Sequence, residues 1–157
     1  RQRQMCIRDS FGYDPLPTYV EPEESPVSQP DLLKEYPLIC MASLKPGLYT
    51  HSQFRSLPWL KELMPDPWIE IHPQKAEELS IKDGEVVVVE SLRGSIELKC
   101  KVVDAMDPRM VSVTHGWGNP YPEPQPVTNI LTPHEIRCPI SDATSNRCFL
   151  VKVTKKR

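Results

Sequence analysis

The sequence predicts a mainly β protein, folded as a compact six-stranded barrel with short helices and long loops. Two observations predict this class. Proline accounts for 18 of the 157 residues, and a mostly helical fold is disfavoured because proline ends helices. Residues 95–103 alternate strictly, with Ile, Leu, Cys and Val on one face and Ser, Glu and Lys on the other, as a half-buried strand requires.

Each strand is predicted as an apolar or alternating run that turn residues bound. The strands are residues 37–42, 68–72, 85–92, 95–103, 110–114 and 149–153. Arg93-Gly94 is predicted to be the turn between the third and fourth of them, and Asp83-Gly84 and Asp107-Pro108 are further turns.

Short helices are predicted in the connections. Residues 57–64 carry leucines at helical spacing, with Pro58 in the first turn. Pro73 opens a second short helix, and His72 is its entry residue. Residues 30–36 are predicted to hold one helical turn.

Composition divides the chain into three regions. Residues 1–10 resemble the conceptual translation of a transposase sequencing adapter, so we interpret them as a scar. Residues 11–34 are a proline-rich, acidic linker, expected to be extended. Residues 35–157 are the folded domain. On this interpretation the chain is the C-terminal piece of a longer protein.

Charge and cysteine usage exclude several classes of protein. Lysine plus arginine is 19 and aspartate plus glutamate is 21, which gives a net charge of −2 and argues against nucleic-acid binding. No apolar run approaches the ~20 residues of a membrane helix. The five cysteines lack a C-x-x-C pair, so we expect reduced thiols and neither a disulfide framework nor a metal site.

Two polar loops could hold a ligand. Residues 49–55 offer hydroxyls, backbone N–H groups and a cation, which together suit a polyphosphate. Residues 115–117, His-Gly-Trp, offer close backbone approach at a glycine and a flat apolar ring. Asn129 presents both a donor and an acceptor to a heterocycle. A polar surface loop, a core tryptophan and a helix cap are the respective structural alternatives.

Taken in order, these strings resemble one family. The matching strings are Tyr36-Pro37-Leu38-Ile39, Tyr49-Thr50-His51-Ser52-Gln53-Phe54-Arg55, Glu70-Ile71-His72-Pro73, Ile81-Lys82-Asp83-Gly84-Glu85, Glu90-Ser91-Leu92-Arg93-Gly94, Asp107-Pro108-Arg109, His115-Gly116-Trp117, Asn129-Ile130-Leu131-Thr132 and Cys138-Pro139-Ile140-Ser141. Over about residues 35–154 the chain resembles the C-terminal molybdopterin-dinucleotide-binding domain of molybdopterin oxidoreductases, the dimethyl-sulfoxide-reductase superfamily. The strings His-Ser-Gln-Phe-Arg at residues 51–55 and His-Gly-Trp at residues 115–117 are most similar to its acetylene-hydratase-like branch.

The resemblance implies a double-psi β-barrel whose loops at one end grip bis(molybdopterin guanine dinucleotide) with molybdenum or tungsten. The cofactor-binding residues that it implies are Ser43, Leu44, Lys45, Leu48, Tyr49, Thr50, His51, Ser52, Arg55, His115, Gly116, Trp117, Asn129 and Arg147. The His-Gly-Trp string would lie against a pterin, and Asn129 would hydrogen-bond pterin edges. Two departures weaken the match: Lys45 stands where the family often has arginine, and Asp142 stands where glycine is usual.

In this family the metal ligand and the iron–sulfur cysteines lie upstream of this domain. We therefore expect no catalytic residue and no metal ligand in the chain, and predict that the chain alone is inactive. The implied partners are the upstream domains, with a 4Fe-4S cluster, and an iron–sulfur electron-transfer subunit. The cytoplasm is favoured, and the periplasm stays open. The alternatives are a stand-alone small cofactor-binding subunit and a non-enzymatic double-psi barrel binding module.

Overall fold

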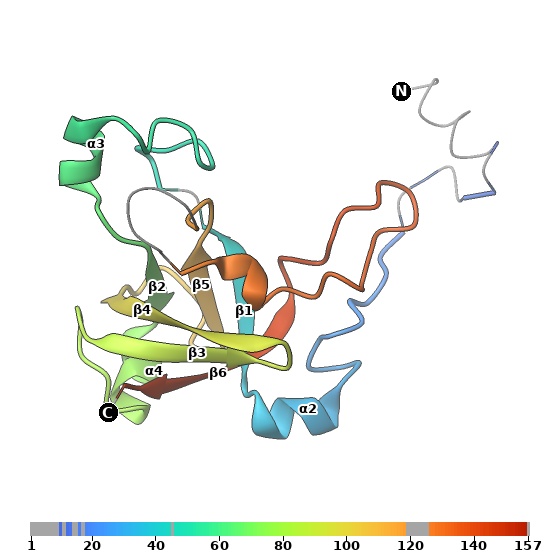
Figure 1. Cartoon of the computed structure of the whole chain (residues 1–157). Coiled ribbons are helices and arrows are strands. Elements are labelled where there is room, and N and C mark those ends of the chain that lie inside the picture. The colour runs from blue at the N-terminus through green and yellow to red at the C-terminus, as the bar shows by residue number, and fades with distance from the viewer. Residues whose placement is uncertain are drawn as a thin grey trace.

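A closed barrel of six strands forms the centre of the computed structural model, which describes residues 10, 12–13, 16, 18–44, 46–118 and 126–156 (Figure 1). The strands are β1 (Leu38–Leu44), β2 (Trp68–Ile71), β3 (Val86–Ser91), β4 (Gly94–Val102), β5 (Met110–Thr114) and β6 (Phe149–Lys155). The helices are α2 (Pro30–Glu35), α3 (Pro58–Leu63), α4 (Pro73–Glu78) and the 3₁₀ turn η1 (Thr128–Ile130). The predicted mainly β, six-stranded barrel is confirmed.

The strand order around the barrel is β1-β5-β2-β4-β3-β6. Two pairs are parallel, β1 with β5 and β2 with β4, and the other four are antiparallel. In the β1–β5 pair Leu44 lies opposite Thr114, so both strands end at the same rim of the barrel. This parallel pairing decides which loops can meet.

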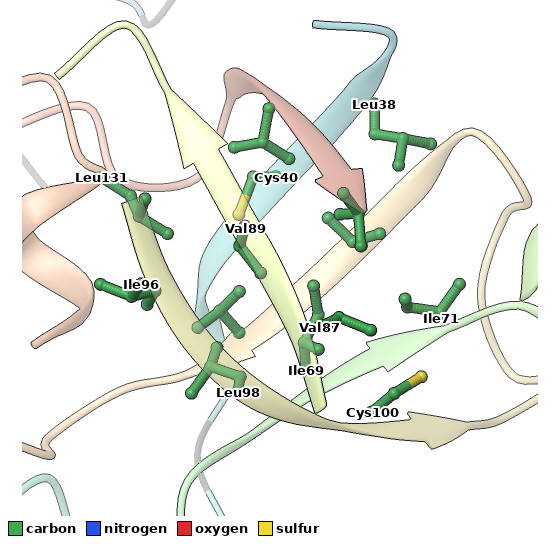
Figure 2. Packing of buried hydrophobic residues seen from close by; sticks show 14 of the residues in the cluster. Leu38, Cys40, Ile69, Ile71, Val87, Val89, Ile96, Leu98, Cys100 and Leu131 are labelled. Atoms are coloured by element: carbon green, nitrogen blue, oxygen red, sulfur yellow. The ribbon is translucent and has the colours of Figure 1, made fainter. Parts of the chain in front are cut away.

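The barrel interior is filled by aliphatic side chains from all six strands (Figure 2). On β4 the buried residues are Ile96, Leu98 and Cys100, which is the face that the alternation predicts. Val87 and Val89 of β3 lie beside them, fully removed from solvent. Each such side chain contributes about 1.5–3 kcal/mol of burial free energy, so the interior is the main source of stability.

The short helices begin where proline allows. Pro58 and Pro73 occupy the first turns of α3 and α4, as predicted. His72 precedes α4, and its Nδ1 accepts a hydrogen bond from the backbone N–H of Gln74 at 3.1 Å. The histidine is therefore a helix cap, as expected, because it satisfies an otherwise unpaired amide of the first turn.

The β3–β4 hairpin turn lies one residue earlier than predicted. Leu92 and Arg93 form the turn, while Gly94 pairs with Ser91 as the first residue of β4. The Ser91 hydroxyl accepts a hydrogen bond from the Arg93 N–H at 3.2 Å and closes the turn. Gly94 is required for space and not for the turn itself, because an added Cβ would lie 2.7 Å from Cγ2 of Ile130.

The proline-rich segment is folded back on the barrel over part of its length. Residues 23–28 form turns, α2 follows, and Glu24 and Ser25 are buried. The segment is therefore not extended throughout. Residues 1–9 lie outside the described part of the chain. The prediction that residues 1–10 are a scar therefore falls almost entirely on residues that the structure does not describe. Within the described residues, no helix has the length and apolar character to cross a bilayer.

Cys100 provides a test of the barrel interior. Its side chain is 2% exposed, and burial raises the pKa of its thiol to about 11. At pH 8 the folded chain should therefore react with iodoacetamide at Cys100 at least about tenfold more slowly than the unfolded chain, since the thiolate is the nucleophile. Mass spectrometry of the alkylated peptides measures both rates. Equal rates would contradict the packing of β4.

Candidate functional site

The candidate site lies at the barrel rim where β1 and β5 end, which is the upper end in Figure 1. The backbone N–H of His115 donates to the carbonyl of Leu44 at 3.1 Å. Ser43 and Leu44 therefore lie beside the start of the His-Gly-Trp loop, although the two segments are some seventy residues apart in sequence. The convergence that the sequence predicts for these two loops is confirmed.

Thr114 brings a third segment to the same rim. Its buried hydroxyl accepts from the backbone N–H of Trp68 at 2.9 Å and donates to the Trp68 carbonyl at 3.0 Å. The Thr128 hydroxyl donates to the Thr114 carbonyl at 2.8 Å, which fixes η1 and hence Asn129 beside the end of β5. Sequence reasoning missed both threonines. The available signal was a hydroxyl residue directly before each site string.

His51 and His115 meet across the two loops. Nδ1 of His51 lies 2.5 Å from Nε2 of His115, and the rings are 4.6 Å apart at 76°. In a hydrogen bond between two imidazoles, one ring donates its N–H and the other accepts it. His51 has φ +56°, an uncommon conformation for a non-glycine residue.

Gly116 makes this approach possible. Its φ is +92°, and a Cβ at this position would lie 2.4 Å from the carbonyl oxygen of His51. Any other residue would collide with the backbone of the first loop. The glycine predicted to allow close approach to a ligand therefore allows the close approach of two protein segments.

Trp117 is buried and supports the loops from beneath. The Arg55 guanidinium lies 4.6 Å above its ring, and Tyr49 packs against it edge-on with centroids 5.5 Å apart. Arg55 also donates to the Gly116 carbonyl. Trp117 was expected to face a pterin and Arg55 a phosphate, and the structure directs both of them toward the protein.

Tyr49 extends this support to α3. Its hydroxyl donates to the carbonyls of Leu60 at 2.9 Å and Met64 at 3.0 Å, at the last turn of the helix. Burial raises the pKa of Tyr49, so the phenol stays protonated and can act as the donor. Tyr49, Met64 and Trp117 form a small apolar cluster separate from the barrel interior.

Most of the remaining predicted residues are exposed to solvent. Leu48, Thr50, Ser52 and Asn129 are exposed. Arg147 is also exposed and follows Asn146, whose carbonyl accepts from the N–H of Ala42 on β1 at 2.9 Å. Lys45 lies outside the described residues, as do residues 119–125 of the loop after Gly118.

The exposed groups are the donor set that a dinucleotide needs. Hydroxyls and a guanidinium suit phosphate oxygens, and the Asn129 amide suits a heterocycle edge. The chemistry of these residues therefore fits the cofactor that the resemblance implies. In the described part of the chain, no cluster of three or more His, Cys, Asp or Glu side chains could hold a metal ion.

Gly116→Ala tests how the two loops are joined. The substitution forces a side chain into a positive-φ position against the His51 carbonyl, which should cost about 1–3 kcal/mol of unfolding free energy. Urea unfolding measures the change. Gly47→Ala is the matched control, because its Cβ would meet no described atom within 4 Å. Equal stability of the two variants would contradict the geometry of the His51–Gly116 contact.

Comparisons with known proteins identify the family of this chain. Residues 40–149 match the family described as "Molydopterin dinucleotide binding domain". The chain is 33% identical over 148 residues to dopamine dehydroxylase of Eggerthella lenta, covering 89% of this chain and 14% of that protein. It is 36% identical over 122 residues to acetylene hydratase of Syntrophotalea acetylenica, covering 78% of this chain and 17% of that protein.

A solved structure of an acetylene hydratase also has this fold. The structure of acetylene hydratase from Pelobacter acetylenicus superposes with a TM-score of 0.81 at 28% identity, covering 96% of this chain and 22% of that chain. The barrel, the order of its loops and the sequence matches therefore lead to one conclusion. The chain belongs to the molybdopterin dinucleotide-binding domain family, and its relatives are molybdoenzymes of the dimethyl-sulfoxide-reductase superfamily.

Proposed function

We propose that this domain binds bis(molybdopterin guanine dinucleotide), carrying molybdenum or tungsten, through the loops at the β1–β5 rim. The supporting observation is the convergence of three separate segments there. The His115 amide bonds to Leu44, and the Thr128 hydroxyl bonds to Thr114. A ligand at this rim could therefore be contacted from the loops after β1, after β5 and at η1 together.

The proposal divides the site residues into two layers. Thr50, Ser52 and Arg147 are the proposed phosphate contacts, and Asn129 is the proposed contact to a heterocycle edge. Beneath them, Arg55 and the Tyr49–Trp117 pair hold the loops in place. A rigid lower layer favours binding because less conformational entropy is lost when the ligand arrives.

The histidine pair is proposed to join the two loops that flank the ligand. The His51 and His115 rings are in contact, so each ring orients the other and limits the motion of both loops. When bound, the cofactor supplies the metal and its dithiolene sulfurs for the chemistry. This chain supplies binding and orientation.

The whole protein is proposed to be a molybdopterin-dependent oxidoreductase in the broad sense that includes hydratases. The chain spans 14% of dopamine dehydroxylase and 17% of acetylene hydratase. We propose that upstream domains of the same polypeptide cover the other side of the cofactor and carry a 4Fe-4S cluster. An iron–sulfur subunit is the proposed electron partner, and the cytoplasm is the proposed compartment, with the periplasm as the alternative.

An apolar surface beside the site supports a covering domain. Phe54, Trp59 and Leu63 are 53%, 60% and 71% exposed and lie on the loop after β1 and on α3. Several exposed large apolar side chains on neighbouring segments are typical of an interaction surface. We propose that the upstream domains contact the loop after β1 and α3.

Asn129→Ala in the full-length protein tests the cofactor contact. The loss of a hydrogen bond that leaves a partner unpaired costs about 1–3 kcal/mol, so cofactor retention should fall by about tenfold or more. Metal and pterin content after dialysis measures it. Gln74→Ala on α4 is the control, because its side chain contacts Glu78 on that helix and not the rim. Unchanged retention in the Asn129 variant would reject the proposed contact.

The isolated chain should bind weakly and turn over nothing. Half of the proposed contacts are missing while the entropic cost of association remains, and no catalytic group is proposed in this chain. Residues 11–157 supplied with the metal-bearing dinucleotide should show no viologen oxidation and no acetylene hydration above the cofactor alone. Turnover by the isolated chain would place the chemistry in this domain and overturn the assignment.

A further inference from the structure

Arg93 stands between two carboxylates that come from distant parts of the chain. Its Nη2 lies 2.9 Å from Oε2 of Glu24, which belongs to the proline-rich segment. Its Nε donates to Oε1 of Glu135 at 2.8 Å, and Nη2 donates to the same oxygen. Glu135 follows η1, the turn that carries Asn129. One guanidinium thus bridges the proline-rich segment and the Asn129 segment.

Glu24 is fixed to the barrel as well as to Arg93. Its side chain is only 4% exposed, and its Oε1 accepts from the backbone N–H of Leu150 on β6 at 3.4 Å. The turn that presents it is closed by Ser25, whose hydroxyl accepts from the N–H groups of Val27 and Ser28 at 3.2 and 3.1 Å. The carboxylate is therefore held in place from both sides.

The junction between the proline-rich segment and the hairpin is not completely filled by side chains. A hollow of about 240 Å³ lies beside the ion pair, lined among others by Gln29, Leu32, Leu92 and Ile136. The apolar side chains therefore leave space between them here, whereas Arg93 and Glu24 are in direct contact beside the hollow.

The free energy gained from this ion pair is offset by the cost of removing both charged groups from water. Buried ion pairs often add little over apolar residues of the same size. Among the described residues, Nη1 of Arg93 and Oε2 of Glu24 are both buried without a hydrogen-bond partner, so the Arg93–Glu24 contact is an ion pair and not a hydrogen bond. What such a pair supplies is a fixed geometry, because the planar guanidinium presents its donors in a rigid fork. The hydrogen bond from Arg93 lowers the pKa of Glu135 to about 2, so that partner remains charged at neutral pH.

The hairpin tip also touches η1 directly. A Cβ on Gly94, next to Arg93, would lie 2.7 Å from Cγ2 of Ile130, so the hairpin tip packs closely against η1. The Asn129 carbonyl accepts from the hydroxyl of Thr132 at 3.1 Å. Asn129 is therefore bracketed by Ile130, which contacts the hairpin, and by the segment that leads to Glu135.

We propose that Arg93 is a positioning residue, which joins the proline-rich segment to the Asn129 segment through Glu24 and Glu135 so that the two move as one body. The position of the proline-rich segment and the position of Asn129 then both depend on the Arg93 side chain. The consequence for cofactor binding rests on the proposed function, whereas the coupling itself does not.

Hydrogen exchange of the 157-residue chain, followed by mass spectrometry, tests the coupling without cofactor. In Arg93→Met, peptides from residues 18–29 and from residues 128–137 should both exchange about tenfold faster, since the ion pair with Glu24 and the charge-assisted hydrogen bonds to Glu135 are both lost. Lys99→Met is the matched control on β4: it removes a more exposed ion pair, with Asp66 at 2.6 Å, and should change neither segment. Faster exchange in only one segment for Arg93→Met would overturn the proposal.

Neutral variants of the two acids test the coupling reciprocally. Glu24→Gln should speed exchange in residues 128–137, to which Glu24 is joined only through Arg93 in the described part of the chain. Reciprocally, Glu135→Gln should speed exchange in residues 18–29. Glu23→Gln, an exposed neighbour, is the control for the first and should leave residues 128–137 unchanged. If each acid variant loosens only its own segment, the proposal fails. This pair also decides the question if Arg93→Met does not fold.

Arg93→Lys separates positioning from charge. Lysine keeps the charge but has one ammonium in place of the fork, so at least one of the two segments should still exchange faster than in the unmodified chain. Complete recovery of both segments would show that charge alone suffices and would overturn the positioning role. Because no readout uses the dinucleotide, a failure of the proposed cofactor site would leave these results unaffected.

Discussion

The parallel pairing of β1 with β5 is the constraint on which the site depends. Antiparallel neighbours would have sent the loop after one strand to the opposite rim from the loop after the other. With Leu44 opposite Thr114, the chain leaves both strands at the same level and in the same direction. The His51–His115 contact, the fit of Gly116 and the docking of Thr128 on Thr114 all follow from that register.

Local patterns predicted the strands and the helices because each pattern has a local physical cause. The alternation in β4 and the prolines that open α3 and α4 are properties of neighbouring residues. The family resemblance predicted the convergence of the loops, which no local pattern contains. The contacts of Trp117 and Arg55 with each other and with Gly116 were not predicted, because a flat ring and a cation can serve a ligand or a neighbouring loop equally well.

The role of Arg93 could not be predicted for the same reason, because local sequence patterns do not show which distant residues a side chain contacts. In sequence Arg93 is an ordinary turn residue next to glycine, and its partners are dozens of residues away on either side. Glu24 belonged to a stretch that composition assigned to solvent, yet its carboxylate is among the most buried polar groups described. Burial of a charge is decided by its partners in space, so no count of prolines and glutamates could have located it.

The burial of Glu24 bears on where this domain can be cut. A version that began at residue 35 would keep every strand of the barrel. It would nevertheless remove the acceptor of the Leu150 amide and leave the Arg93 guanidinium with Glu135 alone. A shortened domain that keeps these contacts therefore has to begin upstream of the turn at residues 23–28, and a domain swap between relatives should exchange that turn together with its own hairpin.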